Sequence, residues 1–189
     1  VDEEITAQVT EHLQQMGIEI YTGAKVTEIT ADAVKFQQGG AEKEVQSEQV
    51  LMAVGRAPDL SGIDTEALGI RVEKGAILTD KTLKTSVDHI YAIGDVNGKA
   101  MLAHTASMEG NVATESIRGE TVFMEFAKIP TAIYIQPELA TVGLIEKQSV
   151  EQSAHMKAGK FPLLGNGKAK VAGEGKGLIS AGRAAKKGA

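Results

Sequence analysis

The chain has 189 residues, of which 42% are hydrophobic and 24% charged, and its formal net charge is −5. This composition is that of a globular protein and excludes collagen-like and largely disordered chains. The absence of cysteine excludes a thiolate zinc site, a cysteine nucleophile and a redox disulfide within these residues. No apolar run approaches the roughly 20 residues of a spanning helix, and Val1–Ile5 does not resemble a secretory signal, so we expect no membrane association.

Charge is distributed unevenly along the chain. Residues 1–50 carry 10 acidic and 3 basic side chains, whereas residues 155–189 carry 8 basic and 1 acidic. A basic segment can bind nucleic acid. Here, however, the lysines are interleaved with Gly and Ala, and Phe161 is the only aromatic residue, although single strands require stacking platforms. We therefore expect no nucleic-acid partner.

The first part of the chain alternates one helix with short strands. Ile5, Val9, Leu13 and Met16 form one helical stripe, which predicts a helix over residues 3–16 that stops at Gly17. Three β-like runs follow, at residues 18–21, 25–30 and 33–36, with a turn signal at Gly39-Gly40. Residues 49–54 are almost continuously apolar, which predicts a strand buried on both faces, as in a parallel sheet.

The second part is also mixed. Pro58 favours a loop over residues 56–59, and residues 76–79 and 89–93 are strand candidates. A helix is predicted over residues 101–118, with Leu102, Ala106, Ala113 and Ile117 on one side. Residues 131–135 and 139–142 are β-like, short β-like runs continue to residue 179, and residues 181–189 show no periodicity. The order of elements predicts a mixed α/β fold built of two or three incomplete units.

A candidate ligand site follows the predicted strand 89–93. Asp95 would lie at the carboxyl edge of a sheet, where ligands of α/β proteins bind, and its carboxylate could accept hydrogen bonds from a ribose or ribityl hydroxyl. Six residues later, Met101 to His104 open the predicted helix, whose unpaired N–H groups can stabilise negative charge on a cofactor. From these residues alone, a turn cap for Asp95 and a surface position for His104 remain alternatives.

Gly55 is a weaker candidate. It follows the apolar run at residues 49–54, and a glycine there permits a close backbone approach to a ligand or a positive φ angle. Taken alone, this residue is better explained as an ordinary strand-to-loop glycine.

Several segments together carry a family resemblance. These are Asp2 to Ile5, Val50 to Pro58, Thr85 to Val87, Ile90 to Val96, Met101 to His104, Ile129-Pro130, Tyr134 to Glu138, Ala140 to Leu144 and Phe161-Pro162. Their order and spacing resemble those of the flavin-dependent pyridine nucleotide–disulfide oxidoreductases, over residues 1–179.

The resemblance implies a domain organisation. The chain would be part of a Rossmann-like NAD/FAD-binding two-domain flavoprotein plus the start of an α+β dimer-interface domain. Residues 1–55 are expected to be the second half of the NAD-binding domain. Residues 56–126 would be the central domain and the return to the FAD-binding domain, and residues 127–189 a truncated dimerisation domain.

The resemblance also implies the cofactor contacts. Asp95 would hold the ribityl chain of FAD, and Met101, Leu102, Ala103 and His104 would set the helix start against the pyrimidine edge of the flavin. Val26 and Gly55 match positions that line the NAD site. No catalytic residue and no metal ligand is expected, because the family's Gly-x-Gly-x-x-Gly loops, redox-active cysteine pair and His-Glu pair are not in the sequence.

Within the family, the Met-Leu-Ala-His helix start is most similar to that of the dihydrolipoyl dehydrogenase branch. This implies oxidation of protein-bound dihydrolipoamide with FAD and NAD, a homodimer, and the lipoyl domains of 2-oxo acid dehydrogenase complexes as partners, in the cytoplasm or an organelle matrix. We expect these residues to belong to a longer enzyme and to be inactive alone. Alternatives are a mercuric reductase, a transhydrogenase, or a non-catalytic dimerisation or interaction module of the same fold.

Overall fold

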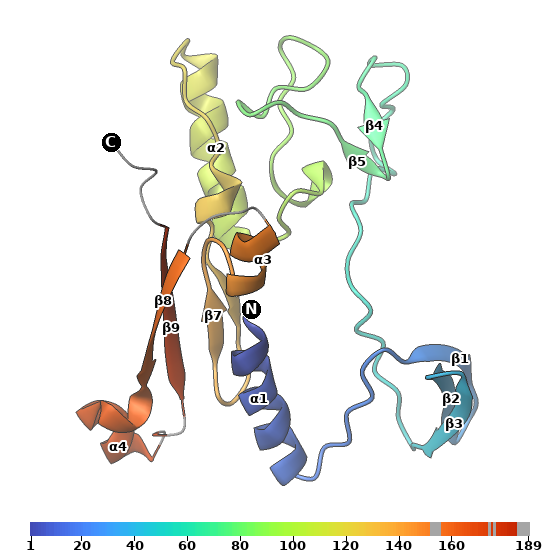
Figure 1. Ribbon diagram of the computed structural model, residues 1–189. Coiled ribbons are helices and arrows are strands. Elements are labelled where there is room, and N and C mark those ends of the chain that lie inside the picture. Colours follow the sequence, from blue (N-terminus) through green and yellow to red (C-terminus); the bar gives the residue numbers. More distant parts are fainter. Residues whose placement is uncertain (152–155, 174, 176, 185–189) are drawn as a thin grey trace. The chain divides into compact units, whose positions relative to one another are not determined.

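The computed structural model describes residues 1–151, 156–173, 175 and 177–184 (Figure 1). The chain divides into two units, unit 1 with residues 1–54 and 145–189 and unit 2 with residues 55–144. Within the described residues every strand pair is antiparallel, and no helix is both long and apolar enough to cross a bilayer.

Unit 1 opens with the predicted helix, α1 (Glu3–Gln15). Its stripe packs inward around Val9, which is buried. Met16 follows as the C-cap and is 61% exposed, because it lies past the last full turn and leaves the buried face. Gly17 has a φ of +86°, the left-handed conformation in which helices commonly end. Both predicted ends of the helix are therefore confirmed within one residue.

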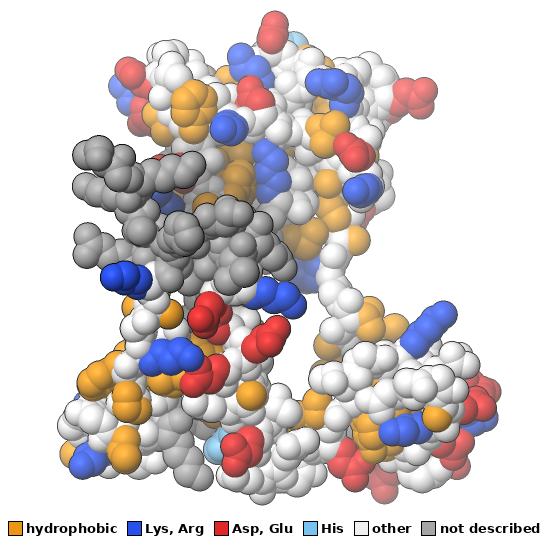
Figure 2. Space-filling view, viewed as in Figure 1, with side chains coloured by type: hydrophobic (Ala, Val, Ile, Leu, Met, Phe, Trp, Pro, Cys, Tyr) orange, Lys and Arg blue, Asp and Glu red, His pale blue; other side chains and the backbone are white. Residues whose placement is uncertain are grey.

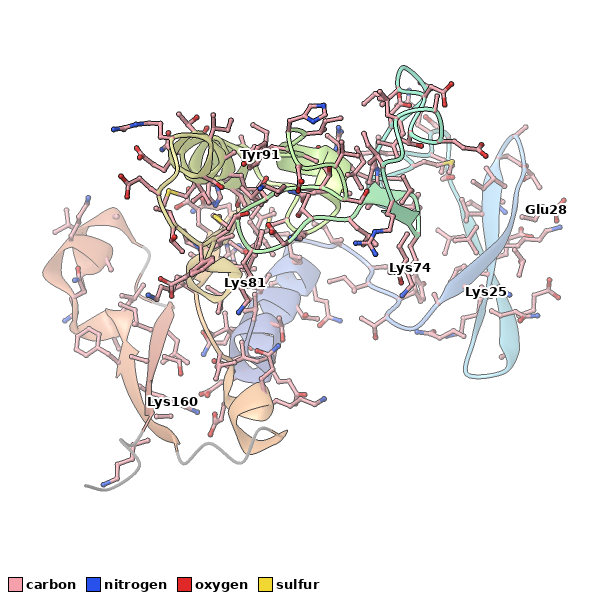
Figure 3. All side chains as sticks on the ribbon, turned by 90° about the horizontal axis from the view of Figure 1, so that it is seen from above. Lys25, Glu28, Lys74, Lys81, Tyr91 and Lys160 are labelled. Carbon is pink, nitrogen blue, oxygen red and sulfur yellow. The ribbon has the colours of Figure 1, made fainter. Side chains whose placement is uncertain are left out.

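Three strands follow as an antiparallel meander, β1 (Lys25–Ile29), β2 (Ala33–Gln38) and β3 (Ala41–Gln46). Lys25 and Glu28 mark β1 in Figure 3. Phe36 of β2 is buried, and its ring lies 4.8 Å from that of Tyr21, centroid to centroid. Strand β3 was not predicted because its sequence is polar. It forms because Gly39 and Gly40 both adopt positive φ, the two-residue turn that matches strand twist.

The remaining elements of unit 1 come from the end of the chain. They are α3 (Glu146–Glu151), β8 (Met156–Pro162), the 3-10 turn η3 (Leu163–Gly165), α4 (Gly167–Ala172) and β9 (Leu178–Ala184). Strand β9 pairs with β8 along its whole length, from Met156↔Ala184 to Pro162↔Leu178. The prediction of no regular structure after residue 180 is therefore wrong for residues 181–184, and residues 185–189 lie outside the described part.

Two predicted strands of unit 1 are absent from the described structure. Residues 18–21 and residues 49–54 are irregular and do not belong to a strand. Leu51 and Val54 are 89% and 87% exposed, and hydrophobic side chains reach the surface in both units (Figure 2). A strand buried on both faces needs neighbouring strands and covering helices, and the described residues provide neither for this apolar run.

Unit 2 contains two hydrophobic clusters. One gathers Leu83, Val112, Ala113 and Met124, and the other Ile70, Ile77 and Ala92. The elements of unit 2 are β4 (Val72–Glu73), β5 (Ala76–Ile77), the 3-10 turns η1 (Gly94–Asn97) and η2 (Phe126–Lys128), α2 (Ala103–Ile117), β6 (Thr131–Ile133) and β7 (Leu139–Thr141). Figure 3 labels Lys74 in the turn between β4 and β5 and Tyr91 beside α2.

Helix α2 confirms the predicted helix, but its buried face is rotated from the expected one. Thr105, Glu109, Val112 and Ala113 are buried, whereas Ile117 is 66% exposed at the last turn. The predicted strand 89–93 is wrong, because its ladder is reduced to one bridge between Lys84 and Tyr91. Ala92 of this segment is nevertheless buried, and the segment leads directly into η1.

Asp80 stabilises the turn that contains Leu83. Its Oδ1 accepts hydrogen bonds from the backbone N–H groups of Thr82 at 2.8 Å and Lys84 at 3.1 Å, and from the Thr82 hydroxyl at 2.7 Å. Desolvation raises the pKa of Asp80, but the hydrogen bonds and the Lys84 charge outweigh it and hold the pKa below its ordinary value.

A lowered folded-state pKa contributes stability above the unfolded pKa of about 4, and this stability is lost as pH falls through the folded pKa. We therefore expect the protein to lose stability below about pH 4, and Asp80→Asn to show a smaller loss over the same range. Urea denaturation at pH 6 and pH 3 measures both. Asp88→Asn, at an exposed position of the same unit, should behave as wild type, and an unchanged pH dependence in Asp80→Asn would contradict the assignment.

Candidate cofactor-binding site

The turn η1 presents the predicted carboxylate. Ile93 is extended, and the chain then turns at Gly94, which has a φ of +74°. A Cβ on Gly94 would lie 3.4 Å from the Cβ of Ala106 on α2, so glycine allows the turn to lie directly on the helix. The Asp95 side chain is 45% exposed, which leaves its carboxylate accessible to a ligand.

Arg56 faces this carboxylate. Its Nε lies 3.6 Å from Oδ2 of Asp95, and the Arg56 side chain is 76% exposed. Ion pairs this exposed contribute about 1 kcal/mol or less. The pair therefore adds little to the stability of the fold, and hydroxyl groups of a ligand can replace it at the carboxylate with little cost.

Helix α2 begins beside this turn with its first N–H groups uncapped. Leu102 is the N-cap with extended backbone angles, and no side chain caps the helix. Because the first turn of any helix has no i−4 carbonyl partners, this end carries partial positive charge. Met101 and Leu102 are half-buried, whereas Ala103 and His104 are exposed, so the helix start is open to an electron-rich group.

His104 has a further contact. Its Nε2 lies 2.8 Å from the carbonyl oxygen of Pro130. A carbonyl can only accept, so Nε2 carries the proton and donates it. The imidazole therefore ties the start of α2 to residue 130 of the same unit, a role that the sequence did not indicate.

A cavity of about 470 Å³ lies beside these groups in unit 2, lined by Arg56, Ile77, Asn97, Lys99 and Met101 among others. Lys99 Nζ donates to the carbonyl oxygens of Thr79 at 3.0 Å and Asp80 at 3.1 Å. Desolvation lowers the pKa of Lys99, although Glu109 and Asp80 oppose the shift. The cavity thus joins Arg56 and Met101, which lie far apart in the sequence.

Glu109 holds the turn against the helix. Its side chain is fully buried on α2, and its Oε2 accepts hydrogen bonds from the Gly94 N–H at 2.5 Å and from Asn97 Nδ2 at 3.0 Å. Sequence reasoning missed this residue. The signal was present, because position 109 falls between Ala106 and Ala113 on the predicted apolar side, where a charged residue is rarely fully buried without a partner.

The two residues predicted for the NAD site belong to different units. Val26 lies on β1 opposite Phe36 and is 55% exposed. Gly55 is exposed, has a φ of +119° and begins unit 2. The exposure of Val26 and Gly55 and the positive φ of Gly55 are compatible with ligand contact. Their role at an NAD site stays a prediction.

The arrangement around Asp95 suits part of a flavin. An exposed carboxylate matches a chain of hydroxyl donors, and the uncapped helix start matches a ring edge that becomes electron-rich. The phosphate-binding Gly-x-Gly-x-x-Gly loop is not in the sequence. Within the described residues, no group of three potential metal-ligating side chains occurs.

Comparison with known families and proteins places the chain. Residues 1–110 match the family model described as pyridine nucleotide-disulphide oxidoreductase, and residues 129–185 match the dimerisation domain of the same group. Curated proteins called dihydrolipoyl dehydrogenase are 38% identical over 173 residues in Staphylococcus aureus and 39% identical over 174 residues in Bacillus subtilis. Each alignment covers 89% of this chain and 37% of the relative, so the chain spans well under half the length of these proteins.

Solved structures agree in fold. LpdA from Mycobacterium tuberculosis has a TM-score of 0.87 and 25% identity, covering 99% of this chain and 41% of that protein. The HOCl-induced flavoprotein disulfide reductase RclA from Escherichia coli has a TM-score of 0.80 and 26% identity, covering 97% and 43%. The expected mixed α/β fold of a nucleotide-binding flavoprotein is therefore confirmed.

Proposed function

The chain belongs to the pyridine nucleotide-disulphide oxidoreductase family, and on that premise we propose that it forms part of a dihydrolipoyl dehydrogenase. In this reaction dihydrolipoamide loses two electrons and two protons to become the cyclic disulfide, and NAD is reduced to NADH with release of one proton. The identity to curated proteins of that name over most of the chain carries the proposal.

The residues of this chain would bind and orient the cofactors. The Asp95 carboxylate accepts hydrogen bonds from the ribityl hydroxyls of FAD, and the α2 start, with Met101, Leu102, Ala103 and His104, lies at the electron-rich ring edge. Val26 and Gly55 contact NAD. Bound FAD supplies the two-electron chemistry. The chain contains no cysteine, so the redox disulfide must come from residues outside these 189, which alone we expect to be inactive.

The proposed partners follow from the same premise. A dimerisation domain matched over residues 129–185 supports a homodimer. Protein-bound dihydrolipoamide as substrate makes the lipoyl domains of 2-oxo acid dehydrogenase complexes the second partner.

Intact mass and visible absorption of one purified sample test the proposal. We expect a mass well above 19.9 kDa, flavin absorption bands, and NAD reduction that depends on dihydrolipoamide. A mass near 19.9 kDa without flavin would instead support the non-catalytic interaction module. A flavin-loaded protein that reduces another substrate but not NAD with dihydrolipoamide would place it in a different branch of the family.

A further inference from the structure

A fully buried carboxyl group on α2 is the starting observation. Glu109 is 0% exposed, and burial of a carboxyl group costs free energy unless hydrogen bonds compensate for the lost hydration. Its Oε2 has two donors, the Gly94 N–H and Asn97 Nδ2. Among the described residues its Oε1 has no partner, and neither has the buried hydroxyl of Thr105. A hydrophobic side chain would fill this position at a lower cost in free energy. The two hydrogen bonds to η1 are therefore what a glutamate provides here and a hydrophobic side chain does not.

Both bonds hold the same short segment. Gly94 and Asn97 are the first and last residues of η1, and Asp95 lies between them. Asn97 Nδ2 also donates to the Ala92 carbonyl at 3.3 Å, and its Oδ1 accepts from the Lys99 N–H at 3.0 Å. One buried side-chain pair, Glu109 and Asn97, therefore fixes the backbone on both sides of Asp95.

Backbone packing makes the same connection. Gly94 lies against Ala106, and Gly110 lies against the Ile93 side chain, where a Cβ would be 3.6 Å from Cδ1. The turn and the first two turns of α2 thus contact each other over residues 106–110. Because Asp95 and the start of α2 are the two groups that would bind one ligand, their relative orientation depends on this contact.

We propose that Glu109 is a positioning residue, which clamps the turn η1 to α2 so that the Asp95 carboxylate and the uncapped helix start face one polyhydroxyl ligand. The ligand assignment to FAD rests on the proposed function, whereas the clamp rests on the structure. Glu109 touches no reacting atom and acts through Gly94 and Asn97.

Three substitutions in the complete, flavin-loaded protein test this role. Glu109→Ala removes both hydrogen bonds. Glu109→Gln keeps a side-chain oxygen that can accept them, and its N–H₂ takes the place of Oε1, which has no hydrogen-bond partner among the described residues. Val112→Ala is the matched control, because it loses buried volume from the same helix without touching η1.

Two readouts separate positioning from general stability. Hydrogen–deuterium exchange of the peptide over residues 92–98 reports the clamp, and titration of the apoprotein with FAD reports the ligand. In Glu109→Ala we expect about tenfold faster exchange and about tenfold weaker FAD binding, from loss of the two hydrogen bonds to η1. Glu109→Gln should restore both to within about threefold, and Val112→Ala should lower the melting temperature with FAD affinity within about threefold of wild type.

Each outcome decides between the two claims. If Glu109→Ala binds FAD as wild type does, or if Val112→Ala changes exchange and affinity as much as Glu109→Ala, Glu109 is an ordinary core residue and the inference is wrong. If the wild-type protein itself does not bind FAD, the proposed function fails. The exchange of residues 92–98 then still decides the clamp, which is refuted if Glu109→Ala and Val112→Ala exchange alike.

Discussion

Replacement of Asp95 by alanine is expected to weaken FAD binding by about 10- to 100-fold, because a carboxylate that accepts hydrogen bonds from ligand hydroxyls contributes roughly 1.5–3 kcal/mol. The carboxylate is half-exposed, and its ion pair with Arg56 is at the surface. Its removal should therefore change the free energy of unfolding by less than about 1 kcal/mol. Loss of binding without loss of stability distinguishes a ligand contact from a turn cap.

Fluorescence titration of FAD with the apoprotein measures the affinity, and urea denaturation measures the stability. Asp95→Asn keeps one acceptor oxygen and should bind FAD with an affinity between those of wild type and the alanine variant. Asp88→Ala, an exposed carboxylate of the same unit, is the matched control and should bind as wild type. If Asp95→Ala unfolds more readily and still binds FAD normally, Asp95 is a structural cap.

The sequence predicted the elements whose signals are local. Helix α1 has an apolar stripe and a terminal glycine, and α2 also has apolar residues at helical spacing. The ends of both helices were therefore predicted to within two residues. Strand β3 was missed because one of its faces is entirely polar and the other has Lys43 between Ala41 and Val45. Pairing with β2 determines it. At residues 49–54 the error is the opposite one, because a strand was predicted from the apolar sequence and is absent. A strand of this kind needs neighbouring strands, and the described residues do not provide them.

Only part of the candidate site was predicted, because only some of its residues are close together in the sequence. Asp95 and the start of α2 could be predicted because they are near each other in the sequence and carry the family's motif. Arg56 lies 39 positions from Asp95 and meets it only in the folded unit. Glu109 lay within a predicted helix, but its function depends on the backbone of Gly94 folding back onto that helix. Contacts made by tertiary packing were therefore the part that sequence reasoning missed.

Truncation of Leu83 is expected to have the largest effect on the stability of unit 2. Leu83 is fully buried and packs with Val112, Ala113 and Met124. Leu83→Ala should therefore lower the free energy of unfolding by about 2–5 kcal/mol, from lost burial and a residual cavity. Leu78→Ala, at a side chain that is 39% exposed in the same unit, should cost less than about 1 kcal/mol.

The backbone at Leu83 allows a sharper test, because its φ is +68°, a conformation that costs a non-glycine residue roughly 1–2 kcal/mol. Glycine removes one more methyl group than alanine but relieves this cost, so Leu83→Gly should be no less stable than Leu83→Ala. Hydrogen exchange at Ala92 and Met124, whose N–H groups donate to the carbonyls of Leu83 and Lys81 at 3.1 Å and 2.9 Å, reports unfolding of this unit specifically. A glycine variant less stable than the alanine variant by about 1 kcal/mol, the usual cost of glycine where φ is negative, would mean that the turn does not hold Leu83 in the left-handed conformation.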